Sequence, residues 1–199
     1  MAKTKIAVLV SGGGTNLQAL IDAQGRVLNS GEIALVVSNA RGAYALERAK
    51  KAGIATATVL KKELGSQEAF ETKLMEILEE NGIEVIILAG FMTILTERFT
   101  SRYPKRILNV HPALIPSFCG EGFYGLKVHE EALKYGVKVT GATVHFVNEI
   151  PDGGEIIAQK AVYIEAGDTP EILQRRVMEQ AEWILLPQAA EMVCASMEE

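Results

Sequence analysis

Short apolar runs recur along the first 110 residues of the chain. Four of them are rich in Val, Ile and Leu and show no polar alternation; they cover Ile6–Val10, Ile33–Val37, Val85–Ala89 and Ile107–Val110. Continuous apolar runs of this length are typical of strands that are buried on both faces of a parallel sheet. The pattern therefore predicts a central sheet whose two faces are both covered.

Helical patterns separate these runs. Apolar residues three or four positions apart predict helices over Leu17–Ala23, Tyr44–Ala52 and Gln67–Glu80. The apolar stripe of the third helix consists of Phe70, Leu74, Ile77 and Leu78. Gly53 and Gly82 lie just past the second and third helices, where a left-handed residue often ends a helix. Alternating strands and helices imply right-handed crossovers, so residues 1–112 are interpreted as a mononucleotide-binding half.

The pattern changes after Pro112. An irregular stretch extends to Gly125, a short helix is predicted near Val128–Tyr135, and two further strands are predicted over Val137–Val147 and Ile156–Ile164. An irregular stretch of that length inside a compact domain is more often functional than idle.

The last long helix is predicted to begin at Thr169-Pro170-Glu171, which combines an N-cap, a proline at N1 and an acid in the first turn. The predicted fold class is α/β, a Rossmann-like three-layer fold with a mainly parallel central sheet, helices on both faces and a mixed C-terminal half. No repeat or linker forces a boundary. We therefore expect residues 1–199 to form one domain, made of halves 1–112 and 113–199.

Composition and charge narrow the class of protein. The chain has 199 residues, 48% hydrophobic and 23% charged, and no apolar stretch approaches the roughly 20 residues that cross a bilayer. A formal charge of −5 and a pI near 5.4 argue against a broad nucleic-acid surface. Cys119 and Cys194 lie far apart, without ligands at metal-binding spacing, which predicts free thiols and no metal. We expect a cytoplasmic monomer or homodimer whose partners are small molecules, not nucleic acid or membrane.

Asn109 and His111 stand at the end of the fourth apolar run. Residues i and i+2 of a strand project from the same face, and the carboxyl end of a strand is where open α/β sheets bind ligands. An imidazole can move a proton near neutral pH, and an amide N–H can donate to an oxyanion. The pair suggests transfer of a small acyl group. The alternative is that Asn109 satisfies a turn and that Pro112 merely holds His111 extended.

A glycine-rich turn, Ser11-Gly12-Gly13-Gly14-Thr15-Asn16, joins the first strand to the first helix. Its glycines allow the backbone to approach a ligand closely, and the helix N-terminus offers unpaired N–H groups to an anion such as phosphate. The Lys-Ser/Thr ending of a Walker A loop is absent, and Leu17 stands where a dinucleotide fingerprint has its third glycine. A dinucleotide is therefore disfavoured. The alternative is an ordinary tight connection between strand and helix.

Asp152 precedes two glycines in the turn after the strand predicted over 137–147. If this turn folds toward Asn109, the carboxylate is expected to hold the His111 imidazolium and raise the pKa of His111. The alternative is a turn former that is hydrogen-bonded to its own backbone.

Three other polar residues carry weaker signals. His145 is expected to be a buried histidine that is satisfied by one hydrogen bond. His129, near the start of a helix, is expected either to touch a substrate or to be solvated at the surface. Glu182, beside the only tryptophan, Trp183, is expected either to reach a pocket or to face water.

Four segments, in order and at fitting spacing, closely resemble the phosphoribosylglycinamide formyltransferase family of purine synthesis: residues 6–19, 88–92, 107–117 and 141–154. The resemblance implies transfer of a formyl group from 10-formyltetrahydrofolate, a co-substrate, to the amine of glycinamide ribonucleotide in de novo purine biosynthesis, without a metal. It also implies that residues 113–199 are the folate-binding and catalytic half.

The resemblance gives individual residues a task. Asn109 would stabilise the oxyanion, His111 would assist proton transfer, and Asp152 would orient His111. The residues that match the family's phosphate loop are Gly14, Thr15 and Asn16. The residues that match its folate-binding positions are Phe91, Met92, Thr93, Ile94, Leu95 and Asn109, together with the turn from Val147 to Asp152. Glu182 matches a substrate-contacting glutamate if one extra residue is allowed before Pro187.

The chain departs from the family pattern at two positions and in one loop. Thr93 stands where many members have an arginine, and Gln67 stands where some have an arginine on the folate side. Contacts with the glutamate tail of the folate are therefore not carried over. The stretch Phe118–Gly125 is longer than the family pattern, so the match at Gly125 and His129 depends on an insertion there.

Three other functions stay open at this point. Formyltetrahydrofolate deformylase passes the formyl group to water but lacks a glycine-rich phosphate loop, and methionyl-tRNA formyltransferase adds a C-terminal domain and a basic surface for tRNA. The glycine loop and the acidic composition favour the ribonucleotide transferase over both. A third possibility is a phosphate- or nucleotide-binding module without catalysis, in which Asn109, His111 and Asp152 are structural.

Overall fold

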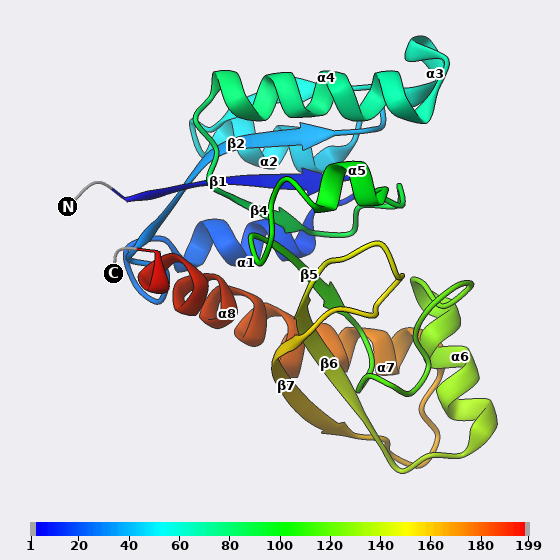
Figure 1. Ribbon diagram of the computed structural model, residues 1–199. Coiled ribbons are helices and arrows are strands. Elements are labelled where there is room, and N and C mark those ends of the chain that lie inside the picture. Colours follow the sequence, from blue (N-terminus) through cyan, green and yellow to red (C-terminus); the bar gives the residue numbers. More distant parts are fainter. Residues whose placement is uncertain (1–2, 198–199) are drawn as a thin grey trace.

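The computed structural model describes residues 3–197 as a seven-stranded sheet with helices on both faces (Figure 1). The strands are β1 Thr4–Val10, β2 Gly31–Ser38, β3 Ala55–Thr58, β4 Val85–Leu88, β5 Ile107–His111, β6 Val139–Phe146 and β7 Ile156–Tyr163. The helices are α1 Thr15–Ala23, α2 Tyr44–Lys51, α3 Lys61–Leu64, α4 Gln67–Glu80, α5 Glu97–Thr100, α6 Leu126–Tyr135, α7 Pro170–Val177, the π-helix Met178–Glu182 and α8 Trp183–Ser196.

The strand order is β3-β2-β1-β4-β5-β6-β7. The strands from β3 to β5 pair in parallel, whereas β6 pairs antiparallel with both β5 and β7. The direction of winding reverses between β1 and β4, and ligands bind at such a switch point in open α/β sheets. The predicted fold, a Rossmann-like α/β sheet that is mainly parallel and mixed in its C-terminal half, is confirmed.

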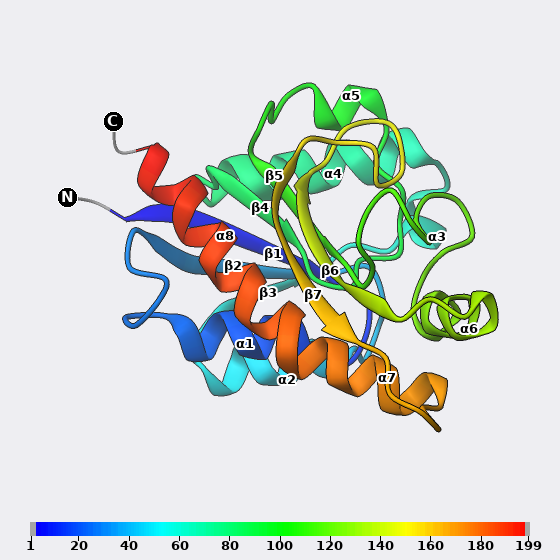
Figure 2. The ribbon, with the colours of Figure 1, turned by 90° about the horizontal axis from the view of Figure 1, so that it is seen from below.

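Two apolar cores hold the helices against the sheet. One core lies under α1, α2, α7 and α8, which cover the same face in Figure 2, and its helical contacts include Leu17, Leu20, Ala45 and Leu186. The other core lies under α4 and α5, and its helical contacts include Phe70, Leu74, Leu78 and Phe99. The predicted stripe of α4 is confirmed, with Ile77 at the margin of the second core. Because β1 and β4 are buried on both faces, the sheet is a rigid platform for the residues at its edge.

The four predicted apolar strands are β1, β2, β4 and β5, and the helix ends also follow the sequence. Gly53 and Gly82 have φ of 72° and 64°, as the left-handed end of a helix requires. Thr169 caps α7 by accepting a hydrogen bond from the Ile172 N–H at 3.3 Å, and Pro170 occupies N1.

Three short elements were not predicted. Strand β3 has the sequence Ala-Thr-Ala-Thr, which lacks the large apolar side chains that mark a buried strand. Helices α3 and α5 have four residues each, too few for a helical period to be visible.

The last predicted helix is continuous along α7 and α8 but contains a π-turn at Met178–Glu182. The hydrogen bonds of a π-helix join residues five positions apart, one more than in an α-helix. Pro187 lies inside α8, where a proline removes one N–H donor. Within residues 3–197, no helix combines the length and hydropathy that crossing a bilayer demands.

Candidate active site

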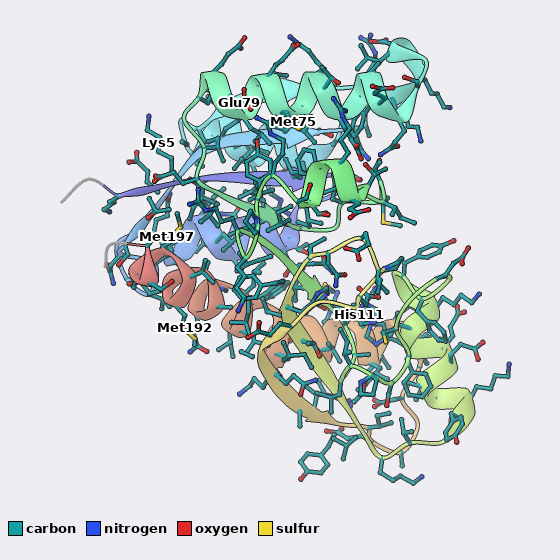
Figure 3. All side chains as sticks on the ribbon, viewed as in Figure 1. Lys5, Met75, Glu79, His111, Met192 and Met197 are labelled. Carbon is teal, nitrogen blue, oxygen red and sulfur yellow. The ribbon has the colours of Figure 1, made fainter. Side chains whose placement is uncertain are left out.

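The carboxyl end of β5 carries Asn109 and His111 side by side with β6. In the antiparallel register, Asn109 lies opposite His145 and His111 lies opposite Thr143. Thr143 donates to the carbonyl of Ala113 at 2.7 Å, which fixes the backbone directly after His111. Figure 3 shows the His111 side chain between the sheet and α6.

Asp152 lies at the end of the turn after β6 and faces both predicted partners. Its Oδ2 is 3.4 Å from His111 Nδ1, and its Oδ1 accepts a long hydrogen bond of 3.5 Å from Asn109 Nδ2. The Gly120 N–H also donates to Asp152 Oδ2 at 2.9 Å. The structure therefore gathers the amide, the imidazole and the carboxylate in one place.

A glycine shapes the turn that presents Asp152. A Cβ atom on Gly154 would lie 1.7 Å from the carbonyl oxygen of Phe146, so no other residue fits this close approach. Asp152 itself has a φ of 55°, in the left-handed region that Asp tolerates better than most residues. The turn is thus built to aim this carboxylate at β5.

Burial controls the protonation of His111. The side chain is 4% exposed, and this burial lowers its pKa below 6.5, although the Asp152 charge and the Phe118 carbonyl act in the opposite direction. The expected effect of Asp152, which is to raise the His111 pKa, is present, but desolvation outweighs it and the net pKa lies below 6.5. Burial also raises the pKa of Asp152, but its contacts with the His145 and His111 rings and with the Gly120 N–H together bring it below its usual value.

His111 is held on both ring nitrogens. Nδ1 faces Asp152, and Nε2 lies 2.8 Å from the carbonyl oxygen of Phe118. A carbonyl and a carboxylate can only accept hydrogen bonds, so the two contacts together suit an imidazolium that carries both protons. They stabilise the form of the ring that results when it accepts a proton.

The glycine-rich turn adopts the shape of an anion site. Gly14 is the N-cap residue of α1, with a φ of 73°, and a Cβ atom there would lie 2.6 Å from Ala45 Cβ. The N–H groups of Thr15 and Asn16 have no acceptor in the described part of the chain. Arg48 supports the turn through a 2.8 Å hydrogen bond from Nε to the Gly13 carbonyl.

Glu182 lies behind this turn and is buried, at 6% exposure. Asn16 Nδ2 donates to its Oε2 at 2.8 Å. Burial raises the pKa of Glu182 to about 6, although the Asn16 bond acts in the opposite direction. Of the two alternatives for Glu182, facing water is therefore wrong.

His129, in the first turn of α6, is fully buried, so a solvated surface role is wrong. Neither ring nitrogen has a hydrogen-bond partner within residues 3–197. Burial, helped by the nearby His111, lowers the pKa of His129 to about 4. It is a neutral ring in an apolar setting.

A cleft of about 130 Å³ opens on Asn109, His145 and Asp152. Its walls are Phe91–Leu95 and Val147–Asp152. Ser11 Oγ accepts from the Met92 N–H at 2.9 Å, which links the first wall to the glycine-rich turn. A larger groove of about 440 Å³ runs along α1 beside Trp183 but contains none of these residues.

The two departures from the expected arginines have structural partners instead. Thr93 Oγ1 accepts from Asn39 Nδ2 at 2.8 Å. Gln67 Nε2 donates to Glu71 at 2.7 Å and to the Ile94 carbonyl at 3.0 Å. Both positions therefore brace the wall of the cleft. In the described part of the chain, no group of three His, Cys, Asp or Glu side chains is arranged to hold a metal ion.

Comparison with known proteins agrees with this geometry. The formyl transferase family profile matches residues 4–189. The chain belongs to the formyl transferase family. As a member, it is 42% identical to phosphoribosylglycinamide formyltransferase of Escherichia coli, over 88% of this chain and 80% of that protein. It is also 46% identical to the trifunctional purine biosynthetic protein adenosine-3 of Gallus gallus, over 97% of this chain but 19% of that protein.

The chain thus spans about a fifth of the length of the trifunctional relatives that it matches. Among solved structures of formyl transferases, glycinamide ribonucleotide transformylase 1 of Symbiobacterium toebii has a TM-score of 0.90 and 40% identity, covering 98% of this chain and 89% of that chain. Phosphoribosylglycinamide formyltransferase of Brucella melitensis has a TM-score of 0.88 and 39% identity, covering 98% and 97%.

Sequence reasoning gave no site role to two polar residues that the structure places at this candidate site. His145 was expected to have a single hydrogen bond, yet it contacts Asn109, Asp152 and the Phe146 carbonyl. Asn39, which holds Thr93, was not singled out. The i, i+2 pairing of His145 with Thr143 was visible in the sequence, but only the register with β5 places it beside Asn109.

Proposed function

We propose that the protein transfers a formyl group from 10-formyltetrahydrofolate to the primary amine of glycinamide ribonucleotide, in de novo purine biosynthesis. The observation that carries this proposal is the meeting of Asn109, His111 and Asp152 at the same edge of the sheet as the glycine-rich turn. The names of relatives that align over most of their length, such as the E. coli protein, support it.

The distance between the glycine-rich turn and the trio of Asn109, His111 and Asp152 suits a ribonucleotide that carries an amine on an extended arm. Strand β4 lies between β1, which leads to the glycine-rich turn, and β5, which ends in His111. Two strand spacings amount to about 10 Å. If the phosphate binds at Gly14–Asn16, the ribose and the glycinamide arm span the distance to the trio. Glu182, hydrogen-bonded to Asn16, is the side chain we assign to the substrate near the phosphate.

Asn109 and His111 have complementary tasks in acyl transfer. The amine of the ribonucleotide attacks the activated formyl carbon of the formyl folate. The bond between that carbon and the folate nitrogen then breaks, and tetrahydrofolate leaves with a proton taken up on that nitrogen. One Asn109 Nδ2 hydrogen donates to the oxygen on which negative charge develops. Because its pKa is lowered, His111 is neutral at pH 7 and is able to accept the proton that the amine loses. Asp152 and the Phe118 carbonyl then stabilise the imidazolium.

The cleft between Phe91–Leu95 and Val147–Asp152 fits the ring end of a folate. Its walls include apolar residues such as Phe91 and Ile150, and it opens directly on Asn109 and Asp152. At about 130 Å³ it is smaller than the roughly 300–1,000 Å³ of pockets that enclose whole ligands. We therefore assign only the pterin end to it, with the tail outside.

The division of the chain belongs to the same proposal. Residues 1–112 supply the phosphate site, and residues 113–199 complete the folate and catalytic sites. We propose a cytoplasmic protein that acts on small molecules as a monomer or a homodimer, without nucleic-acid or membrane partners.

The His111→Ala variant tests the proposal against a binding module without catalysis. It is expected to abolish folate-dependent formyl transfer and to leave the ribonucleotide Kd within about twofold, because the phosphate site is on a different strand. Isothermal calorimetry measures the binding, and a formyl-transfer assay measures the turnover. Ribonucleotide binding by wild-type protein that never turns over would favour the module.

A further inference from the structure

We propose that His145 is a positioning residue, which fixes the orientation of the Asn109 amide so that its N–H₂ group faces the reacting carbon. The inference rests on the proposed function and adds to it a residue outside the trio. His145 is 2% exposed, on β6, directly opposite Asn109 on β5.

The backbone determines which nitrogen of His145 carries a proton. Nδ1 lies 2.7 Å from the carbonyl oxygen of its neighbour Phe146, and a carbonyl only accepts hydrogen bonds. Nδ1 is therefore the protonated nitrogen. In the neutral ring Nε2 is then an acceptor, with its lone pair directed away from Phe146.

Asn109 occupies the position that this acceptor requires. Its Nδ2 lies 3.2 Å from His145 Nε2, so one amide hydrogen is donated to the ring. The second hydrogen points to Asp152 Oδ1 at 3.5 Å, at the outer limit of a hydrogen bond. The short bond anchors the amide, and the long bond is the one that a developing oxyanion replaces.

The reversed amide is unfavourable at both contacts. Rotating the Asn109 side chain by 180° would bring its carbonyl oxygen against the lone pair of His145 Nε2 and against the Asp152 carboxylate. Acceptors would then face acceptors in a buried site, where unsatisfied polar contacts are costly. Asp152 also lies 3.5 Å from His145 Nε2, so a charged His145 ring would donate to Asp152 and release Asn109. The neutral ring with a proton on Nδ1 is therefore the competent form.

Two variants separate this role from simple packing. His145→Phe keeps a ring of similar size but has no acceptor, and it is expected to lower kcat roughly 10- to 100-fold, below the 10²- to 10³-fold loss on removing an oxyanion donor. The KM for the ribonucleotide should stay within about twofold. His145→Gln restores an acceptor oxygen and is expected to recover most of kcat. Circular dichroism and thermal unfolding check that each variant folds.

A double-mutant cycle tests whether His145 acts through Asn109. If it does, His145→Phe has almost no effect on kcat in an Asn109→Ala background, whereas an independent role gives multiplied losses. An ¹H–¹⁵N correlation spectrum of wild-type His145 should also show the neutral Nδ1–H tautomer at pH 7.5, and this measurement holds even if His145→Phe does not fold.

The results distinguish this inference from the proposed function. Wild-type protein without folate-dependent turnover would contradict the function itself. If the wild-type protein turns over normally, three results would each overturn the role of His145 alone. They are an unchanged kcat in His145→Phe, multiplied losses of kcat in the double-mutant cycle, and a proton on Nε2 of the His145 ring.

Discussion

Replacing Glu182 with glutamine is expected to stabilise the protein at neutral pH while lowering its activity. The carboxyl is buried, and the Asn16 amide is its one hydrogen-bond donor within residues 3–197. Burial raises its pKa from 4.5 to about 6. Glutamine keeps an oxygen that accepts from Asn16 but carries no charge to desolvate.

The pKa of Glu182 determines both the size of the expected stabilisation and the pH range over which it appears. A rise from 4.5 to about 6 corresponds to about 2 kcal/mol of stability lost through burial of the ionised carboxyl. Because the pKa is higher in the folded state, the folded protein binds more protons between pH 4.5 and 6. Wild-type stability therefore falls as pH rises through this window, and the cost is fully present above about pH 6. Glu182→Gln should regain about 2 kcal/mol at pH 7.5 and almost nothing at pH 4.

Urea unfolding followed by the fluorescence of Trp183, the single tryptophan, measures this gain at both pH values. For a chain of this size the gain is equivalent to a Tm increase of roughly 4–8 °C. Activity should fall in the same variant, since the negative charge that we assign to the substrate site is lost.

Glu191 on the same helix is the matched control. It accepts hydrogen bonds from the N–H groups of Asn29 and Ser30 at 2.7 and 2.9 Å. Burial raises the pKa of Glu191, but these bonds outweigh it and bring the pKa below its usual value. Glu191→Gln should therefore destabilise the protein. A Glu182→Gln variant that is neutral or destabilised at pH 7.5, or equally stabilised at pH 4, would show that the buried charge of Glu182 does not destabilise the protein.

Three further changes have clear expected outcomes. Gly14→Ala should destabilise the protein by about 2–5 kcal/mol, because its backbone is left-handed and the new Cβ atom would overpack against Ala45. Gly13→Ala, whose Cβ atom would meet nothing within 4 Å, should cost under about 1 kcal/mol. Equal melting temperatures of the two variants would contradict this. His129→Leu should stabilise the protein by about 1–3 kcal/mol, because two unpaired buried nitrogens are removed; a lower urea midpoint would count against it. Asp152→Asn should lower the His111 pKa further, since the carboxylate opposes burial; an NMR titration with an unmoved or raised pKa would remove that role.

The sheet could be predicted from sequence because its central strands are buried on both faces. A run such as Val85–Leu88 has no polar position, so its pattern alone identifies it. The edge strand β3 could not be found in this way, since the side chains of Ala55–Thr58 are small and partly or fully exposed. The π-turn at Met178–Glu182 left no local signal either, because its residues continue the helical pattern on both sides.

The residue types of the candidate site could be predicted, together with the contact of Asp152 with His111, but its other contacts could not. Asn109 and His111 were identified by their place at a strand end, and Asp152 by its turn. The partners of His145 depend on how β6 pairs with β5, and the burial of His129 depends on how α6 packs in the fold, which local patterns do not encode. The net lowering of the His111 pKa was not predicted for the same reason, since desolvation is a property of the packed site.

The most direct test of the account is a turnover assay of the wild-type protein with 10-formyltetrahydrofolate and glycinamide ribonucleotide, with water and methionyl-tRNA as competing acceptors. We expect the formyl group to go to the ribonucleotide amine, and we expect His111→Ala to abolish this transfer. Formyl transfer mainly to water or to tRNA, or full activity of His111→Ala, would contradict it.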